Sequence, residues 1–242
     1  MPRYPLQMYI VRQGDYLTRL AVLHGFDPDE VWNLDENREL RERRPNPNQL
    51  APGDVLQIPA QRAEGPSFAS GGTQRYKADV PKVHIKIHIQ SSDAERQPEP
   101  WQLFGAGKDP ITGTLGRDGN VEFDVPVTVT ECLLRLPQRR VSYPIHVGHL
   151  DPIEEDSGVL QRLAHLGYLA PSLRDVLSRG VLGATAHRPT VPEPPDDARE
   201  HALRSFQRAA GLTETGVVDE ATRDALRSAH DGDEDDSDRG PQ

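Results

Sequence analysis

The sequence predicts a multi-domain α+β protein with an N-terminal βααβ module, a central antiparallel β-sandwich and a C-terminal domain of three helices. The 242 residues are only 35% hydrophobic and 5% aromatic, and they include 20 Gly and 22 Pro. This composition favours several small cores joined by linkers over one large α/β enzyme core or a coiled coil. Along the chain, the spacing of apolar residues changes from helical to alternating and back to helical.

Charge and hydropathy exclude further classes of protein. The formal net charge is −10, and the last twelve residues contain six acidic residues and one basic residue. Because no segment has a basic stripe, we expect no nucleic-acid partner. Because no apolar run approaches 18 residues, we expect no membrane insertion. The stretch Met1–Met8 lacks the apolar core of a secretory signal, so we expect synthesis in the cytoplasm without export by the general route.

Domain boundaries are predicted from changes in composition. A small, polar, Gly-rich stretch and a Pro-rich stretch both have the character of spacers. The acidic C-terminal stretch has too few apolar residues to fold alone. The predicted segments are a first module at 1–62, a linker at 63–75, a β-sandwich at 76–150, a helical domain at 151–230 with a Pro-rich insert at 169–199, and an acidic tail at 231–242.

The N-terminal module is predicted to begin with a strand followed by two helices. The strand covers Met8–Arg12, and apolar residues then recur at helical spacing through Leu17–His24. We expect Asp15 to cap this first helix. Asp27 has the same role before a second helix, which Pro28 can open because proline suits the first helical position.

A Pro-Gly-Asp turn at 52–54 leads into a closing strand, Val55–Pro59. Together with Tyr9–Leu17, these residues resemble a LysM domain, and the resemblance covers residues 8–59. It implies a βααβ fold that binds peptidoglycan, chitin or another glycan containing N-acetylglucosamine. The charged stretch Asn37–Leu50 is an insertion relative to that family.

The LysM resemblance also implies a sugar-binding groove between the loop after the first strand and the loop before the second. Aromatic rings stack on sugar faces, and amides pair with hydroxyl and acetamido groups, which suits a tyrosine and two amides at these positions. The implied glycan contacts are Gly14, Asp15, Tyr16 and Leu17 on one side, and Asn48, Gln49, Leu50 and Ala51 on the other.

The central segment has the alternation of half-buried strands. From Val83 to Ile89, apolar side chains alternate with polar ones. The dipeptide Asp118-Gly119 predicts a hairpin between two later strands. Residues 113–126 resemble transthyretin-like or carboxypeptidase-regulatory-like sandwiches, which implies a domain that positions its neighbours. The further predicted strands are Trp101–Gly105, Thr112–Leu115, Asn120–Val125, Cys132–Leu136 and Val141–Val147.

The C-terminal segment is helical by periodicity, and Asp219 is placed to cap the last helix. The stretches Gly158–Tyr168, Ala202–Gln207 and Gly211–Thr222 together resemble the three-helix peptidoglycan-binding domain family. That family has a short turn between its first two helices, where this chain has roughly thirty residues. The resemblance makes three residues candidate glycan contacts: Tyr168, Gln207 and Thr215.

The order of the three modules, joined by Gly148–Pro152, resembles proteins associated with type VI secretion and other contractile injection systems. This resemblance covers residues 8–230. It implies a spike or hub protein as a partner. It also implies assembly into a secretion apparatus, or delivery by it to the periplasm or a target cell, which would explain a LysM protein without a signal peptide.

Catalytic and metal sites were considered because peptidoglycan-binding modules often accompany hydrolases. His84 and His88 are four residues apart on one strand, roughly 13 Å, which is too far for one zinc ion. His146 and His149 are expected on opposite strand faces. Cys132 lies in an apolar strand, and the acidic residues at 154–156 suit a helix start. We expect no catalytic residue, no metal and no cofactor.

The sequence therefore predicts a non-enzymatic protein that binds peptidoglycan and is a component of a contractile injection system. Two alternatives remain. The protein could be an assembly adaptor whose LysM-like and helical modules dock spike or effector proteins without binding sugar. It could also be a peptidoglycan hydrolase whose site lies unrecognised in the middle domain.

Overall fold

The computed structural model places most of the chain in two compact units, Met1–His149 and Leu150–Gln242. The residues that it describes are 5–60, 80–89, 97–169 and 194–232. The predicted linker at 63–75, most of the Pro-rich insert and the tail beyond residue 232 lie outside the described residues. No helix in the described part of the chain is long and apolar enough to cross a membrane.

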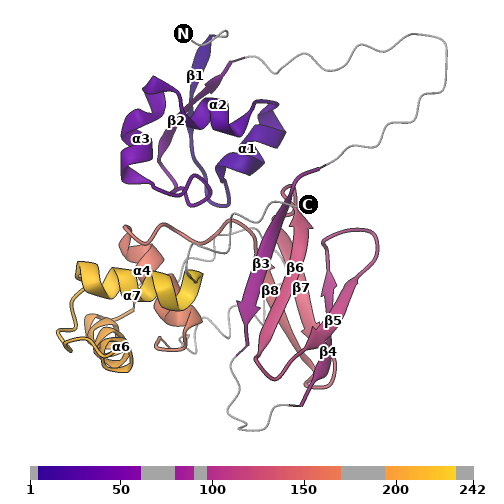
Figure 1. Ribbon diagram of the computed structural model, residues 1–242, viewed down its shortest axis with the longest axis vertical. Coiled ribbons are helices and arrows are strands. Elements are labelled where there is room, and N and C mark those ends of the chain that lie inside the picture. The colour runs from indigo at the N-terminus through magenta and orange to yellow at the C-terminus, as the bar shows by residue number, and fades with distance from the viewer. Residues whose placement is uncertain (1–4, 61–79, 90–96, 170–193, 233–242) are drawn as a thin grey trace. The chain divides into compact units, whose positions relative to one another are not determined.

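The N-terminal module contains the predicted strands and helices (Figure 1). Strand β1 (Leu6–Ile10) pairs antiparallel with β2 (Val55–Pro59). Helices α1 (Leu17–His24) and α2 (Pro28–Trp32) follow β1. The buried apolar side chains of this module are Val11, Leu17, Leu20, Val31, Leu40, Leu50, Leu56 and Ile58.

The charged stretch before β2 adds structure that the LysM resemblance does not include. It forms a short 3₁₀ turn, Asp35–Asn37, and helix α3 (Arg38–Arg43). Leu40 is buried on the inner side of α3, and Arg44 is buried directly after it. One leucine and one buried arginine among polar residues give no helical apolar pattern, so periodicity does not indicate this helix. Membership of the LysM family stays a prediction.

The two predicted caps of this module have different outcomes. Asp27 caps α2, because its carboxylate accepts a hydrogen bond from the backbone N–H of Glu30 at 2.9 Å. The prediction for Asp15 is wrong, because the N-cap of α1 is Tyr16 and has no side-chain cap. The Asp15 carboxylate instead accepts from the Tyr9 hydroxyl at 2.8 Å and from the Arg12 backbone N–H at 2.9 Å.

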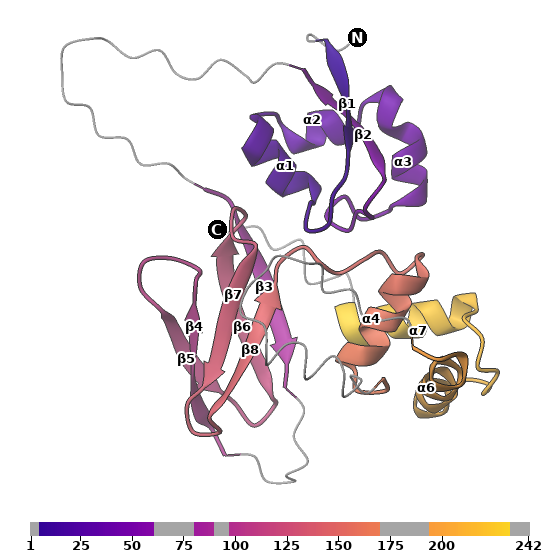
Figure 2. The same ribbon diagram turned by 180° about the vertical axis from the view of Figure 1, so that it is seen from behind.

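The central segment is a two-layered β-sandwich, as predicted (Figures 1 and 2). One layer pairs β3 (Lys82–His88) with β6 (Asn120–Pro126). The other has the strand order β5-β4-β7-β8. Its strands are β4 (Glu99–Phe104), β5 (Ile111–Leu115), β7 (Glu131–Leu136) and β8 (Val141–His146). Side chains such as Leu103, Val125 and Leu134 fill the space between the layers.

The hairpin predicted at Asp118-Gly119 is not formed. Strand β5 pairs with β4, whereas β6 pairs with β3, so the two strands flanking this turn belong to different layers. Gly119 has φ 79°, and its N–H bonds to the carbonyl of Gly116 at 3.2 Å. Leu115 and Val121 on either side are both buried in the core. The turn therefore carries the chain from one layer to the other.

The second unit contains three described helices, α4 (Asp156–His165), α6 (Asp196–Ala209) and α7 (Glu220–Asp231). Helix α4 packs against both of the others. Gly158 allows the start of α4 to approach the preceding loop, because a Cβ there would collide with the carbonyl oxygen of Pro152. The core consists of Ile153, Val159, Leu160, Leu163, Leu169, Ala202, Leu203, Phe206 and Leu226.

Candidate functional site

The loop between α6 and α7 is organised around the side-chain amide of Gln207. This residue is 0% exposed. Its Nε2 lies 3.0 Å from three acceptors, the hydroxyls of Thr215 and Thr222 and the carbonyl of Val217. Its Oε1 accepts from the backbone N–H of Gly216 at 2.9 Å. A single amide therefore fixes the loop and the start of the next helix, because buried polar atoms must find such partners.

The start of α7 is fixed by a second set of hydrogen bonds. The Asp219 carboxylate accepts from the backbone N–H of Thr222 at 2.8 Å and from its hydroxyl at 2.6 Å. These bonds hold the pKa of Asp219 below its ordinary value. The cap predicted at Asp219 is confirmed. Because Thr222 also contacts Gln207, the cap of α7 and the loop form one connected network.

The outer side of the same loop carries charged and apolar groups. Arg208 forms a double contact with Glu214, at 2.8 and 2.6 Å, which raises the pKa of Arg208 and lowers that of Glu214. Arg204 bonds the Glu214 carbonyl at 3.2 Å. Val217 is 64% exposed. Arg204 also pairs with Glu200 at 2.7 Å, so both of these arginines have carboxylate partners and Val217 is the exposed apolar side chain of the loop.

Two of the three residues predicted for sugar contacts in this unit are brought together. Gln207 and Thr215 share a hydrogen bond, whereas Tyr168 packs edge-to-face on Phe206, with ring centroids 5.4 Å apart. Their assignment as glycan contacts stays a prediction. The structure gives the Gln207 amide and the Tyr168 ring internal partners. Two exposed residues, Arg208 near the end of α6 and Val217 in the loop, could not be predicted because a helical arginine and a loop valine carry no distinctive sequence signal.

The family comparison falls on this same region. Residues 195–226 match the model of the family described as "Putative peptidoglycan binding domain". The chain carries a peptidoglycan-binding domain. The match covers α6, the loop around Gln207 and the first half of α7. No curated protein and no solved structure matches the chain.

The predicted groove of the N-terminal module has a different environment. Tyr16 is 3% exposed and belongs to the core of the β-sandwich. Its hydroxyl donates to the carbonyl of Val127 at 3.1 Å, and Arg19 Nη1 donates to the same oxygen at 3.1 Å. Gln13 Nε2 donates to the carbonyl of His149 at 3.2 Å. Burial, as the largest effect, raises the pKa of Tyr16.

Two glycines allow this close approach within the first unit. A Cβ on Gly148 would lie 2.7 Å from the Tyr16 ring and 2.8 Å from the carbonyl oxygen of Gly14. A Cβ on Gly14 would lie 3.0 Å from His149 Nε2. Both glycines have positive φ, 85° at Gly14 and 78° at Gly148, which other residues rarely adopt. The corner that the LysM resemblance assigns to sugar therefore packs against the sandwich.

The two sides of the predicted groove do lie next to each other. The backbone N–H of Leu17 bonds the Pro47 carbonyl at 3.1 Å, and the Thr18 hydroxyl donates to Asn48 Oδ1 at 2.9 Å. Leu17, Leu50 and Ala51 are buried, Gln49 is half-buried and Asn48 is exposed. Of the residues predicted for this groove, Asn48 is the one most open to a ligand.

The residues considered for catalysis form no group of three or more His, Cys, Asp or Glu side chains that could hold a metal ion in the described part of the chain. Burial is the main reason for the raised pKa of the Cys132 thiol. His146 and His149 have ring centroids 5.3 Å apart, so their expected placement on opposite faces is wrong. The strand ends at His146, and Gly148 then turns the chain.

Proposed function

We propose that the chain is a non-enzymatic protein that binds peptidoglycan through its C-terminal helical domain. The observation that carries this proposal is that the family match at 195–226 coincides with α6, the Gln207-centred loop and the start of α7. The exposed groups of that loop suit the ligand. Val217, which is 64% exposed, offers an apolar contact to the methyl groups of the peptide stems of peptidoglycan.

The proposal is tested by co-sedimentation of the full chain with purified sacculi. We expect the wild type to sediment and Val217→Asp to bind roughly tenfold more weakly, as expected for loss of about 1–2 kcal/mol at one contact. The matched control is Val55→Asp, which changes another exposed valine in strand β2 of the N-terminal module. This variant should bind sacculi like the wild type. Wild-type protein that stays in the supernatant would contradict peptidoglycan binding. Soluble muropeptides released by the pure protein would contradict the non-enzymatic assignment.

The cellular setting of this proposal is a type VI or related contractile injection system. It is supported by the order of the LysM-like module, the sandwich and the helical domain along the sequence. In this setting the chain is made in the cytoplasm, and a spike or hub protein is its partner. It then acts in the periplasm or in a target cell. A spike-protein gene beside this one supports the setting, and a neighbourhood of cell-wall synthesis genes argues against it.

A second candidate function for the N-terminal module is that of an assembly adaptor. The burial of Tyr16 against Val127 favours it, because a ring that is 3% exposed has no free face for a sugar. We expect the full chain to bind sacculi but to show no binding of soluble N-acetylglucosamine oligomers in calorimetry. Asn48→Ala, at the exposed residue of the predicted groove, should change nothing. Oligomer binding that Asn48→Ala weakens would reject the adaptor role and support the groove.

A further inference from the structure

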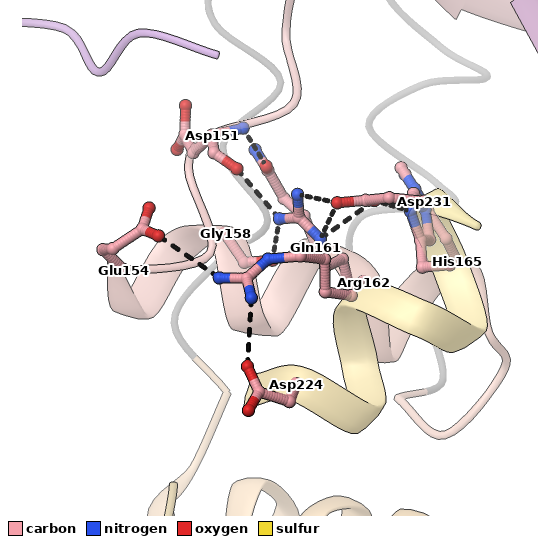
Figure 3. Close-up of polar contacts among 10 residues, drawn as sticks. Asp151, Glu154, Gly158, Gln161, Arg162, His165, Asp224 and Asp231 are labelled. Carbon is pink, nitrogen blue, oxygen red and sulfur yellow. Dashed lines mark hydrogen bonds and ion pairs between the residues drawn. The ribbon is translucent and has the colours of Figure 1, made fainter. Parts of the chain in front are cut away.

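A chain of polar contacts joins α4 to the last turn of α7 (Figure 3). It starts at Arg162 of α4, which is 0% exposed. The Nη2 and Nε atoms of Arg162 lie 2.7–3.2 Å from the carboxylate of Asp231 at the end of α7. Its Nη1 donates to the carbonyls of Asp151 at 2.9 Å and Gly158 at 3.1 Å. The guanidinium therefore holds the Asp231 carboxylate in a fixed orientation.

Two histidines continue this chain beyond Asp231. His230 Nδ1 lies 2.6 Å from Asp231 Oδ1, and His230 Nε2 lies 2.9 Å from Nδ1 of His165 on α4. An ionised carboxylate only accepts, so Nδ1 of His230 carries the hydrogen. When both rings are neutral, Nε2 of His230 is then the acceptor and Nδ1 of His165 is the donor. These contacts define the tautomers of the neutral pair.

The arrangement of the two rings identifies the contact as a hydrogen bond. Their planes are only 24° apart, and their centroids are separated by 5.1 Å. That separation equals the 2.9 Å between the nitrogens plus one ring radius at each end, so the nitrogens of His165 and His230 face each other head-on. Two nitrogens that shared a metal ion would instead point toward a third position between them.

This hydrogen bond needs one bare nitrogen and one N–H. Protonation of both rings would place two N–H groups and two positive charges against each other. The charged groups that face the pair are Arg162 of α4 and Asp231 of α7. One turn earlier in α7, Arg227 lies 3.0 Å from Asp224 and 3.4 Å from Glu154. Arg162 already occupies the Asp231 carboxylate, which limits how far that carboxylate can stabilise a second positive charge.

We propose that the His165–His230 pair is a pH-sensitive latch that adds to the Arg162–Asp231 contact in holding the C-terminal end of α7 on α4 at neutral pH, and that weakens in acid. Desolvation, with smaller contributions from His230 and Arg162, lowers the pKa of His165 from 6.5 to about 4. In the released form the ring regains its ordinary pKa. The latch is therefore complete above about pH 6.5 and weakens progressively as the pH falls toward 4.

The release is confined to one end of the helix. The start of α7 is held by Gln207 and Thr222, which do not titrate, and by Asp219, whose lowered pKa keeps it ionised in this range. The loop that the proposed function assigns to peptidoglycan lies at that end. The latch therefore regulates the accessibility of residues 228–231 without removing the binding loop. The latch proposal rests on the contacts between α4 and α7, and the proposed function rests on the loop. NMR of residues 228–231 tests the first and co-sedimentation with sacculi tests the second, so either can fail without the other.

The test follows the backbone amides of residues 228–231 and the histidine ring nitrogens by NMR on the full chain between pH 7.5 and 4. We expect the ring signals to show the two tautomers assigned above at neutral pH. The population of the released end should rise about tenfold between pH 7 and pH 5. This is a discounted value, because His165 is an exposed residue and solvent screens part of the effect. The amides of residues 211–219 should stay unchanged.

Two variants separate a latch from general acid lability. His165→Gln keeps an amide N–H that can donate to His230 but cannot take up a proton, so the response of residues 228–231 should disappear. His201→Gln, at an exposed histidine of α6, is the matched control and should respond like the wild type. The proposal is overturned by an unchanged acid response in His165→Gln, by a His165 ring that titrates like a free imidazole, or by the opposite tautomers. Co-sedimentation with sacculi at pH 7 should be the same for both variants and the wild type.

Discussion

Replacing Asp231 with Ala is expected to destabilise the helical unit by about 3–5 kcal/mol, because it leaves a buried charge without its carboxylate. Arg162 is completely buried, and Asp231 contacts it through both carboxylate oxygens. Urea unfolding of the full chain, followed by helical circular dichroism, measures the change in free energy of unfolding.

Asp224→Ala is the control for this prediction, since it removes a second aspartate of α7 that also contacts an arginine. Its side chain is exposed, as is much of Arg227, and exposed ion pairs contribute about 0–1 kcal/mol. Equal losses in the two variants would mean that Asp231 stabilises the fold no more than a surface residue does. The prediction for Asp231 would then be wrong.

The second large effect is expected in the N-terminal module at Asp54. Its carboxylate oxygens lie 2.9 and 3.2 Å from Nε and Nη2 of Arg44, and the two side chains are 4% and 6% exposed. The same carboxylate accepts from the backbone N–H of Ala51 at 2.9 Å. Asp54→Ala removes all three contacts from a buried site, so we expect a loss of about 3–5 kcal/mol.

Amide hydrogen exchange of β1 and β2 measures this loss, because it reports the opening of the N-terminal module itself. Glu42→Ala is the control, since Glu42 lies exposed on the neighbouring helix α3. In Glu42→Ala, the protection factors of the β1 and β2 amides should stay within a few-fold of the wild-type values. Protection in Asp54→Ala that matches Glu42→Ala would show that Arg44 and the Ala51 N–H find other partners at little cost.

The strands of the sandwich could be predicted to within about two residues, because alternation of apolar and polar side chains is a local property. The predicted strand from Val83 to Ile89 is β3, and Cys132–Leu136 lies within β7. Which strands pair could not be predicted, since pairing depends on distant partners. The Asp-Gly turn at 118–119 illustrates this, because its sequence suits a hairpin while its flanking strands belong to different layers.

The candidate site shows the same division between local and distant information. The motif around Gln207 and Thr215 could be located from the order of its residues, and the contact between these two side chains agrees with that placement. The burial of Arg162 could not be predicted, because an arginine on an amphipathic helix is normally a surface residue. The burial of Tyr16 was equally hidden, since its partner Val127 is 111 residues away in sequence.

The packing of Tyr16 into the sandwich has a consequence for how the N-terminal module can be assayed. A fragment that ends near residue 62 would lack Val127, Gly148 and the rest of the surface that covers this ring. The fragment would present a tyrosine, an arginine and a glycine turn to solvent that the whole chain keeps covered. Sugar binding measured on such a fragment would describe a surface created by the truncation, so glycan assays of this module require the sandwich to be present.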